Sequence, residues 1–425
     1  MRQAGHVRRA AGRHAGRGVV VVVGASVRAF AESAARAGWS VHAADLFADL
    51  DLRRVADHVV RVTGRGPRGY PDGLPAAIER FPPGPCVYTG GLENHPAVID
   101  AIAAARPLAG NRGGTVRAVR DHARLAAAVR GAGLRFPETV THSRDVPTDG
   151  SFLVKPAATA GGRGIARWRG RMPPRSGGPM VWQRLVAGES WAAAFVAGAA
   201  GCRLLAASRQ LTGMPWCGAR PFAYCGSIDV PLADVPDRVR RDFERAGRTI
   251  AEAFGVVGLF GIDAVVDARS GLHVIEVNPR PTASMELLER ATGVSLAALH
   301  LEACGCPGPA TRPPRPRHGP GVWSKAVVFA RGPCAAVGAA RLAAGTRAWS
   351  DAAGAAAVAD VPRGGATLPA RGPLVTVFAC GDNAERSLAI LRTRAAAIRR
   401  LFAAAVRPPS AAAASRPRPP RARTA

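Results

Sequence analysis

The sequence predicts a mixed α/β and α+β fold, with a parallel sheet near the N-terminus, hairpins in the middle and a small α/β region near the C-terminus. Alternating strand and helix patterns over residues 18–112 predict the parallel sheet. Two β-rich runs that flank the turn sequence at 268–271 predict a long hairpin. Strand patterns followed by one long helical pattern over residues 321–405 predict the small C-terminal region.

The composition is that of a folded protein with more than one domain. The chain has 425 residues, of which 48% are hydrophobic and 5% aromatic, so its core must be built mainly from Ala, Val and Leu. This length suffices for about two to four domains. The eight cysteines are scattered without a CxxC pair, which favours reduced thiols in a cytoplasm. Cys304 and Cys306 are expected to end a helix rather than to bind a metal.

The chain is strongly basic, with a formal net charge of +28. Nearly all of the positive charge is arginine, because Lys155 and Lys325 are the only lysines. This pattern is typical of a GC-rich coding bias, and many of the arginines lie at the two ends of the chain. A basic surface attracts phosphates without specificity. The sequence has no basic helix with interleaved aromatic residues and no zinc-finger or RNA-binding signature, so a nucleic-acid partner is disfavoured.

An apolar run at Val19–Val23 follows several arginines and imitates the start of a secretory signal. The run is short, no small-residue cleavage site follows it cleanly, and it is more typical of a buried parallel strand. No stretch approaches the ~20 apolar residues that a membrane span needs. We therefore expect a cytoplasmic protein with no membrane partner.

The predicted N-terminal domain spans residues 18–112. Its first turn, Gly24–Arg28, lacks the GxGxxG pattern that cradles the phosphates of a dinucleotide. A supporting domain is therefore favoured over a dinucleotide-binding one. The strands and helices expected in it are Val19–Val23, Val27–Ala37, Ser40–Ala44, Cys86–Tyr88 and Pro96–Ala105.

Shifts in composition set the other expected boundaries. Residues 113–306 carry the candidate chemistry, and the Pro/Arg-rich stretch 307–320 is expected to be a linker. Residues 321–405 are predicted to form the small C-terminal domain. Residues 1–17 and 406–425 have no apolar periodicity and are expected to be disordered basic tails. The elements expected in the C-terminal domain are strands at Trp323–Ala330 and Leu374–Ala379 and a helix at Ala384–Ala404.

The strongest local signal is the predicted hairpin over residues 259–280. A hairpin centred on the turn 268–271 places Asp263 opposite Glu276, and the alternation of side chains puts Asn278 on the same face. The opposite face is expected to be apolar and to meet a core. Its predicted members are Ile262, Ala264, Val266, Ile275 and Val277.

Two opposed carboxylates repel each other at the roughly 4.5–5.5 Å that separates such pairs. A divalent cation between Asp263 and Glu276 relieves this repulsion, and Mg²⁺ prefers a few carboxylate oxygens together with substrate phosphates. Mg²⁺, or Mn²⁺ in its place, is therefore the expected metal, with Asp263, Glu276 and Asn278 as its ligands. The alternative is a solvated face with acidic residues by chance. The Asn-Pro-Arg-Pro sequence that stops the strand counts against it, because it aims Arg280 toward the same end.

A second predicted hairpin carries a lysine and a glycine loop. A strand over Ser151–Lys155 ends in the lysine, and the loop that follows contains Gly161, Gly162 and Gly164. Glycines let backbone N–H groups approach phosphates, and a strand-end lysine supplies a point charge to them. Such hairpins are common, but Lys155 stands out in a chain that otherwise uses arginine.

The segment after this hairpin is a short apolar strand that runs into a polar turn at Gly188–Glu189. The backbone of residues 184–186 is suited to meet the edge of an adenine ring. The residues expected at this nucleotide contact are Gln183, Arg184, Leu185, Val186 and Glu189.

The order of these segments resembles the ATP-grasp superfamily. Lys155 and its glycine loop come first, then residues 183–189, and then the hairpin that ends with Arg280. The resemblance is specific over 151–284, and the flanking segments 88–95 and 359–365 look like those of predicted ATP-dependent carboligases related to biotin carboxylase. That branch includes proteins of archaea and of bacteria that use tetrahydromethanopterin, which raises the hypothesis of a role in making that cofactor.

The resemblance implies an ATP-dependent carboxylate ligase whose partners are a small carboxylate and an amine or another nucleophile. ATP would lie between two lobes, with Lys155 on its α- and β-phosphates, the glycine loop over its β- and γ-phosphates, and Arg280 on the transferring phosphoryl group or the acyl phosphate. The family often has a lysine beside an aspartate at the domain entry, whereas Asp121 is followed here by His122, and Arg120 is a candidate substitute. Glu189 matches the usual ribose-binding carboxylate only approximately.

Two alternatives stay open from the sequence alone. An oxidoreductase built on residues 18–112 would bind a dinucleotide, against which the missing GxGxxG counts. A basic scaffold for RNA or acidic partners would depend on the arginines of the two tails. The sequence does not fix the oligomeric state, and a homo-oligomer is compatible with it.

Overall fold

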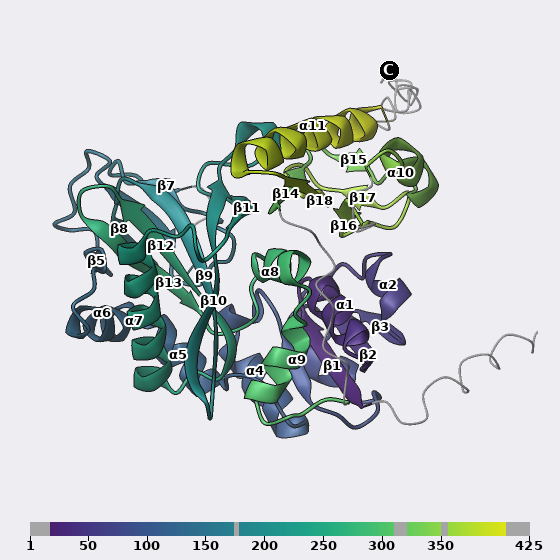
Figure 1. The fold of residues 1–425 in the computed structure, drawn as a ribbon, viewed down its shortest axis with the longest axis horizontal. Helices are drawn as coiled ribbons and strands as arrows, with labels where there is room; N and C mark the ends of the chain where they lie inside the picture. The colour runs from purple at the N-terminus through teal and green to yellow at the C-terminus, as the bar shows by residue number, and fades with distance from the viewer. Residues whose placement is uncertain (1–17, 174–177, 310–320, 350–355, 405–425) are drawn as a thin grey trace, which may run out of the picture.

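The computed structural model describes residues 18–173, 178–309, 321–349 and 356–404. The tails predicted at 1–17 and 406–425, and residues 310–320 of the predicted linker, lie outside this part of the chain. Within the described residues, the strands form a four-stranded parallel sheet, a four-stranded antiparallel sheet, an eight-stranded sheet and a two-stranded pair. Figure 1 shows the parallel sheet beside the two antiparallel ones.

The N-terminal sheet has the order β3-β2-β1-β4, with parallel pairing throughout. The predicted elements of this region are present, and each ends within one residue of its predicted bound. The strand predicted at Val19–Val23 is the buried centre of this sheet. The elements are β1 (Val19–Gly24), α1 (Arg28–Arg36), β2 (Ser40–Asp45), α2 (Leu52–Val55), β3 (His58–Arg61), α3 (Leu74–Ile78), β4 (Cys86–Tyr88) and α4 (Pro96–Ala105).

Two helices lead from this domain into the small antiparallel sheet, whose order is β5-β8-β6-β7. The predicted hairpin of Lys155 is the pair β6 and β7. The elements are α5 (Gly113–Arg120), α6 (His122–Gly131), β5 (Thr139–Val140), β6 (Phe152–Pro156), β7 (Ala166–Arg167) and β8 (Met180–Arg184).

The large sheet has the order β13-β12-β9-β10-β11-β14-β18-β16 and contains the predicted hairpin of Asp263 and Glu276 as β12 and β13. Helices α6 and α7 cover one face, and α9 lies between β12 and α1 (Figure 1). At Gly247 of α7, a Cβ atom would lie 2.3 Å from Phe195 Cε1, so glycine lets the helix pack closely on the sheet. The elements are β9 (Glu189–Gly198), β10 (Gly201–Thr212), β11 (Tyr224–Val230), α7 (Asp237–Phe254), β12 (Gly258–Asp267), β13 (Gly271–Asn278), α8 (Met285–Thr292) and α9 (Leu296–Ala303).

The C-terminal region continues the large sheet, because β14 pairs with β11 and β18 pairs with β14. Helix α11 packs over these strands around Leu391 and Ile398. We still propose the region as a domain, but its strands share their sheet with the middle of the chain. The elements are β14 (Val322–Phe329), β15 (Cys334–Ala335), α10 (Ala339–Thr346), β16 (Val358–Ala359), β17 (Thr367–Leu368), β18 (Pro373–Gly381) and α11 (Ala384–Ala403).

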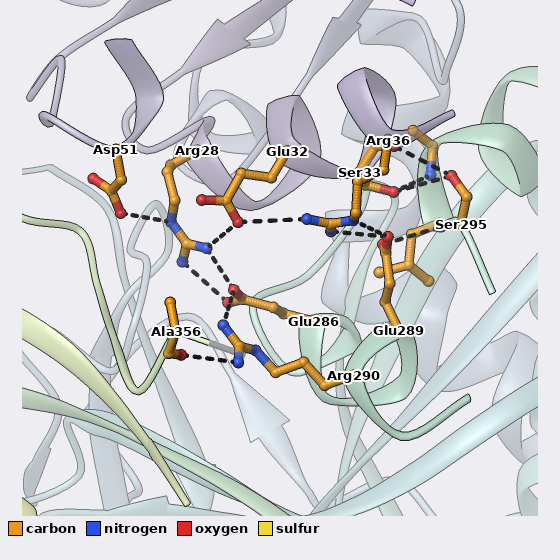
Figure 2. A network of polar contacts seen from close by, with 12 residues as sticks. Arg28, Glu32, Ser33, Arg36, Asp51, Glu286, Glu289, Arg290, Ser295 and Ala356 are labelled. Atoms are coloured by element: carbon orange, nitrogen blue, oxygen red, sulfur yellow. Dashed lines mark hydrogen bonds and ion pairs between the residues drawn. The ribbon is translucent and has the colours of Figure 1, made fainter. Parts of the chain in front are cut away.

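A buried network of charges joins the three regions (Figure 2). The carboxylate of Glu286 in α8 accepts hydrogen bonds from both terminal nitrogens of Arg28 in α1 and, at 2.8 Å, from Lys325 in β14. Arg28 also donates to Asp360 at 2.9 Å, and Arg290 lies 3.7 Å from Glu286. The N-terminal, middle and C-terminal regions therefore meet at one carboxylate.

The end of α9 agrees with one of the sequence-based expectations. Cys304 caps α9, as expected for the end of a helix. None of the eight cysteines, all of which lie in the described residues, forms a disulfide. Across the described ranges, no helix is both long and apolar enough to cross a bilayer.

His300 in α9 links the N-terminal domain to the large sheet. Its Nδ1 atom accepts a hydrogen bond of 2.9 Å from the Leu259 N–H, so its Nε2–H donates to the Ala109 carbonyl at 3.1 Å. Burial lowers the pKa of His300 to about 4, although the bond to Ala109 opposes this shift. The neutral imidazole is thus the form that the fold requires.

We expect His300 to make the protein less stable in mild acid. The unfolded chain takes up the proton near the ordinary pKa of about 6.5 and the folded chain only near 4, so stability is lost as the pH falls from 6.5 toward 4. Between pH 7 and pH 5 the loss from this residue is roughly 2 kcal/mol. Urea unfolding of wild type and His300→Gln at both pH values measures it.

His300→Gln should be less stable than wild type at pH 7. It should also lack the loss of unfolding free energy that protonation of His300 causes between pH 7 and pH 5. Buried acids such as Asp45 and Asp229, whose pKa values burial raises to about 6, titrate in the opposite direction in both proteins. The difference between the two proteins isolates His300. Equal pH slopes for wild type and variant would contradict the assignment.

Candidate active site

The hairpin of β12 and β13 presents two carboxylates and an amide on one face of the large sheet. Asp263 lies opposite Glu276, as predicted, and Gly261 lies opposite Asn278. Side chains alternate along a strand, so Asp263, Glu276 and Asn278 share a face. Asn278 Nδ2 donates a hydrogen bond of 3.0 Å to Asp263 Oδ2, and these two side chains are therefore in contact.

The turn end of the hairpin differs from the prediction. There the pairing is one residue out of step with the register expected from the turn sequence, since Ala264 lies opposite Val274. A β-bulge at Ile275 restores the expected pairing of Asp263 with Glu276. The predicted core position of Ile275 is wrong, because the bulge shifts the alternation and Val274 is the fully buried residue behind the hairpin.

Asp263 is held by two side-chain donors. Besides Asn278, Gln210 of β10, two strands away in the same sheet, donates a hydrogen bond of 2.9 Å to its other oxygen. Burial and the charge of Glu276 raise the pKa of Asp263 to about 7, and Arg280 opposes this rise only in part. The two carboxylates thus repel each other in the protein alone, as opposed acids do.

Glu276 is contacted by an arginine from the domain entry. Arg120 at the end of α5 donates a hydrogen bond of 2.7 Å to Glu276 Oε1 and another of 3.1 Å to Asn94 Oδ1. The sequence suggested Arg120 as a substitute contact to the nucleotide. In the structure its side chain instead contacts Glu276, which is a predicted metal ligand. His122 lies close by: burial and the charge of Lys155 lower its pKa.

Arg280 is fixed by a carboxylate that the sequence reasoning missed. Its Nη2 group donates to Glu93 Oε1, and at 3.2 Å to Asn278 Oδ1. Burial alone would raise the pKa of Glu93, but the charge of Arg280 holds it below its ordinary value. The signal in the sequence that could have identified Glu93 is its place as an acid in the polar segment 89–95, which directly follows strand β4. Arg280 thus connects the N-terminal domain to the face of the hairpin that carries Asn278.

Lys155 projects from the small sheet toward the hairpin. Its ammonium group donates a hydrogen bond to Gln183 Oε1, and Gln183 in turn donates to Thr139 Oγ1 at 3.0 Å. Burial lowers the pKa of Lys155 to about 8, while the charges of Glu276 and Asp263 work to raise it. Lys155 and the two acids therefore belong to one electrostatic site between the two sheets.

The glycine loop adopts backbone conformations that favour glycine. Gly161, Gly162 and Gly164 have φ angles of 63°, 73° and 75°. A Cβ atom on Gly162 would lie 2.0 Å from the carbonyl oxygen of Phe222, and the Gly161 carbonyl accepts a hydrogen bond of 3.1 Å from the Tyr224 N–H. The loop of the small sheet therefore closes onto β11 of the large sheet.

The segment after β8 has part of its backbone already bonded. The Arg184 N–H donates to the Glu138 carbonyl and the Leu185 N–H to the Ser151 carbonyl, both at 2.8 Å. An adenine edge at this segment would therefore meet backbone groups other than these two N–H groups.

Glu189 is the predicted site residue that the structure does not bring to the hairpin face. It lies opposite Val266, three positions after Asp263, so alternation places it on the other face of the sheet. Its carboxylate accepts a hydrogen bond of 3.3 Å from Trp191 Nε1 and lies 3.8 Å from Arg209. In this conformation it does not share a face with the other candidate residues.

The donor set fits a magnesium ion that is shared with a ligand. Within the described ranges, no group of three His, Cys, Asp or Glu residues has the arrangement of a complete metal cage. The hairpin instead offers two carboxylates and an amide oxygen, and the acids repel each other in the absence of a cation. Mg²⁺ is typically held by one or two carboxylates plus substrate phosphates, so Asp263, Glu276 and Asn278 suit it.

The arrangement of a small sheet, a large sheet and a two-carboxylate hairpin agrees with a match to a known family. The sequence model of the ATP-grasp domain matches residues 119–284. This part of the chain is an ATP-grasp domain. Members of this family are ATP-dependent carboxylate ligases, and the chain is an enzyme of that class. No curated protein sequence matches it.

Solved structures of ATP-grasp enzymes share the fold over most of the chain. An N5-carboxyaminoimidazole ribonucleotide synthetase solved with ADP has a TM-score of 0.63 at 13% identity, over 90% of this chain and 97% of that one. An L-amino acid ligase from Bacillus licheniformis has a TM-score of 0.62 at 15% identity, over 89% and 97%. The biotin carboxylase domain of a Hydrogenobacter thermophilus 2-oxoglutarate carboxylase, a dimer solved with MgADP and bicarbonate, has a TM-score of 0.66 at 13% identity, over 90% of each chain. The mixed α/β fold with its large antiparallel sheet is therefore that of an ATP-grasp enzyme.

We expect Glu276→Gln to leave the thermal midpoint unchanged or slightly higher and to reduce ATP turnover strongly. The glutamine keeps the oxygen that accepts from Arg120, and it removes the charge that opposes Asp263. Losing one well-placed electrostatic stabiliser typically costs ~3–4 kcal/mol, or ~10²–10³ in rate. Asp263→Asn should behave similarly, and the double variant should lose less than the sum.

The matched control is Glu252→Gln, which removes an exposed carboxylate from α7. Thermal midpoints and ATP turnover are measured side by side for five proteins. They are wild type, Glu276→Gln, Asp263→Asn, the double variant and Glu252→Gln. Unfolding of Glu276→Gln, or turnover within about twofold of wild type where ~10²–10³ is expected, would show that the hairpin is structural.

Proposed function

We propose that the enzyme uses ATP and Mg²⁺ to convert a small carboxylate to an acyl phosphate, which an amine or another nucleophile then attacks. The observation that supports this function best is the meeting of Lys155 from one sheet with the Asp263–Glu276 pair of the other. Phosphoryl transfer needs positioned phosphates and neutralised charge rather than a covalent protein group. The small sheet supplies the ammonium group of Lys155, and the large sheet supplies the acidic face of Asp263 and Glu276, which would bind Mg²⁺.

We propose one role for each candidate residue. Lys155 would contact the α- and β-phosphates, and the backbone of the glycine loop would cover the β- and γ-phosphates. Asp263, Glu276 and Asn278 would hold Mg²⁺, which when bound neutralises phosphate charge. The backbone from Arg184 to Val186 would meet the adenine. Arg280, which Glu93 fixes in position, would steady the transferring phosphoryl group.

The carboxylate substrate would bind where the parallel sheet faces Arg280. The guanidinium carbon of Arg280 lies 3.4 Å from the Cβ position of Gly90, in the loop after β4. Ligands of open parallel sheets bind beyond the carboxyl ends of the strands. Arg280 Nε and the Tyr70 hydroxyl are both buried there without a hydrogen-bond partner. A substrate carboxylate and its neighbouring polar group would satisfy both atoms.

The structural neighbours supply the substrate classes from which to start. The N5-carboxyaminoimidazole ribonucleotide synthetase was solved with ADP, the 2-oxoglutarate carboxylase domain with MgADP and bicarbonate, and a third neighbour is an L-amino acid ligase. Amino acids and bicarbonate are therefore proposed candidates, and the resemblance seen in the sequence adds carboxylate precursors of tetrahydromethanopterin-type cofactors. The free thiols and the need for ATP favour a cytoplasmic enzyme, and the dimeric neighbour makes a homo-oligomer the state to test first.

We expect ATP to bind tightly only when Mg²⁺ is present, because the metal bridges the acidic hairpin and the phosphates. Isothermal titration of the protein with ATP, with Mg²⁺ and then with excess chelator, tests this expectation. Glu276→Gln should lose most of the metal-dependent gain, whereas Glu252→Gln should keep it. Equal affinity with and without metal would contradict the metal assignment.

The reaction class is tested by a screen for the release of ADP and phosphate. The enzyme is incubated with MgATP and pairs of a candidate carboxylate and an amine, and we expect release that depends on both partners and is lost in Glu276→Gln. Binding of a dinucleotide in the same assays, with no ADP release from any pair, would favour an oxidoreductase on residues 18–112 instead.

A further inference from the structure

A groove lined by arginines lies behind the hairpin, on the face of the large sheet that α7 covers. Its volume is about 830 Å³. Three elements contribute to it: the turn after α6, the outer side of α7, and the start of β13 (their positions can be followed in Figure 1). The residues that line it are Gly133, Leu134, Arg135, Arg238, Arg241, Asp242, Glu244, Arg245, Arg248 and Leu272.

The positive charge of this groove follows from the sequence of α7. Arg238, Arg241, Arg245 and Arg248 recur at spacings of three and four residues, so they lie along one side of the helix. All four are exposed, while Phe243 and other apolar residues of α7 pack into the core. The fold therefore aligns four guanidinium groups, and Arg135 adds a fifth from the opposite wall.

Most of these arginines lack an acidic partner. Arg245 pairs with Asp242 at 2.5 Å, and Glu244 pairs with Arg240 outside the groove. Among the residues that the structure describes, no carboxylate lies within ion-pair distance of Arg135, Arg238, Arg241 or Arg248. Like charges along one helix face are destabilising, so a bound anion would relieve their repulsion.

We propose that this groove binds a small molecule with two or more phosphate groups, at a site separate from the ATP site. Arginine forks are suited to phosphate oxygens, and several arginines without an ion-pair partner among the described residues line this groove. The volume lies within the range of small-molecule pockets. Single-stranded nucleic acids need aromatic platforms for stacking, and the lining contains none. The proposal does not depend on the reaction proposed above.

The groove is connected to the catalytic hairpin by its backbone. The Val274 N–H of β13 donates a hydrogen bond of 2.9 Å to the Arg135 carbonyl. On the other wall, Arg238 Nη2 lies 3.2 Å from the Cβ position of Gly271, at the hairpin turn. An anion that contacts both arginines joins the two walls across β13, the strand that carries Glu276. We therefore expect its binding to reduce local opening of β13 at residues 272–274, behind the face that carries Glu276.

The test is isothermal titration of the nucleotide-free protein with tripolyphosphate in the absence of Mg²⁺. Four proteins are compared: wild type, Lys155→Ala, Arg241→Glu/Arg248→Glu, and the control Arg386→Glu/Arg392→Glu, which makes the same charge change on exposed positions of α11. Lys155→Ala removes the lysine that the proposed ATP site offers to phosphates, so binding that needs this lysine is lost in it. We expect binding to persist in Lys155→Ala and in the control, and to weaken at least ~10-fold in the groove variant.

Weakening of less than ~10-fold relative to the α11 control overturns the proposal. Tighter, groove-dependent binding of a single-stranded RNA of about 20 nucleotides overturns it in favour of a nucleic-acid partner. Hydrogen exchange of the full chain supplies the second readout. Tripolyphosphate should slow exchange at residues 272–274 in wild type and not in the groove variant, and unchanged exchange there overturns the link to the hairpin.

Discussion

Glu286 is the carboxylate on which the arrangement of the three regions depends. It lies at the start of α8, 7% exposed at its side chain, with Arg28 from the N-terminal domain and Lys325 from β14 as its partners. Burial alone would raise its pKa, but the charges of Arg28 and Lys325 hold that pKa well below its ordinary value. Without these partners the buried carboxylate of Glu286 would be strongly destabilising. The docking of the N-terminal region, which brings Arg28, and of the C-terminal region, which brings Lys325, therefore stabilises the middle region.

The same interface places the end of the catalytic hairpin. The Pro279 carbonyl, one residue beyond Asn278, is within hydrogen-bond distance of Tyr88 Oη at 3.1 Å and of Asn111 Nδ2 at 3.0 Å. Both donors belong to the N-terminal domain, as does Glu93, which holds Arg280. The hairpin alone carries the proposed metal ligands, but the N-terminal domain holds the strand end and Arg280 beside them. Its lack of a dinucleotide-binding turn is consistent with such a supporting role.

The sequence predicts the parts of the site that are local and misses those that depend on distant contacts. Asp263 and Glu276 are paired within one hairpin, so alternation and a turn sequence suffice to bring them together. The bulge at Ile275 could not be foreseen, because it reflects how the strand fits the core under it rather than a turn signal. Glu93 and Arg280 are far apart in the chain, and only the docking of two domains makes them partners. Lys325 stood out in composition, yet its role at Glu286 required the C-terminal strands to join the large sheet.

These constraints explain why an ATP-grasp domain should not work in isolation here. The family match covers residues 119–284 and ends just before Glu286, while the partners that neutralise Glu286 lie outside it on both sides. Removing either flanking region would leave a buried charge eight residues from Asn278, in the segment that also carries Arg280. Relaxation of that segment would shift Arg280, which bonds both Glu93 of the N-terminal domain and Asn278 of the hairpin. The position of Arg280, the residue that we propose to face the substrate, therefore depends on how the flanking regions dock.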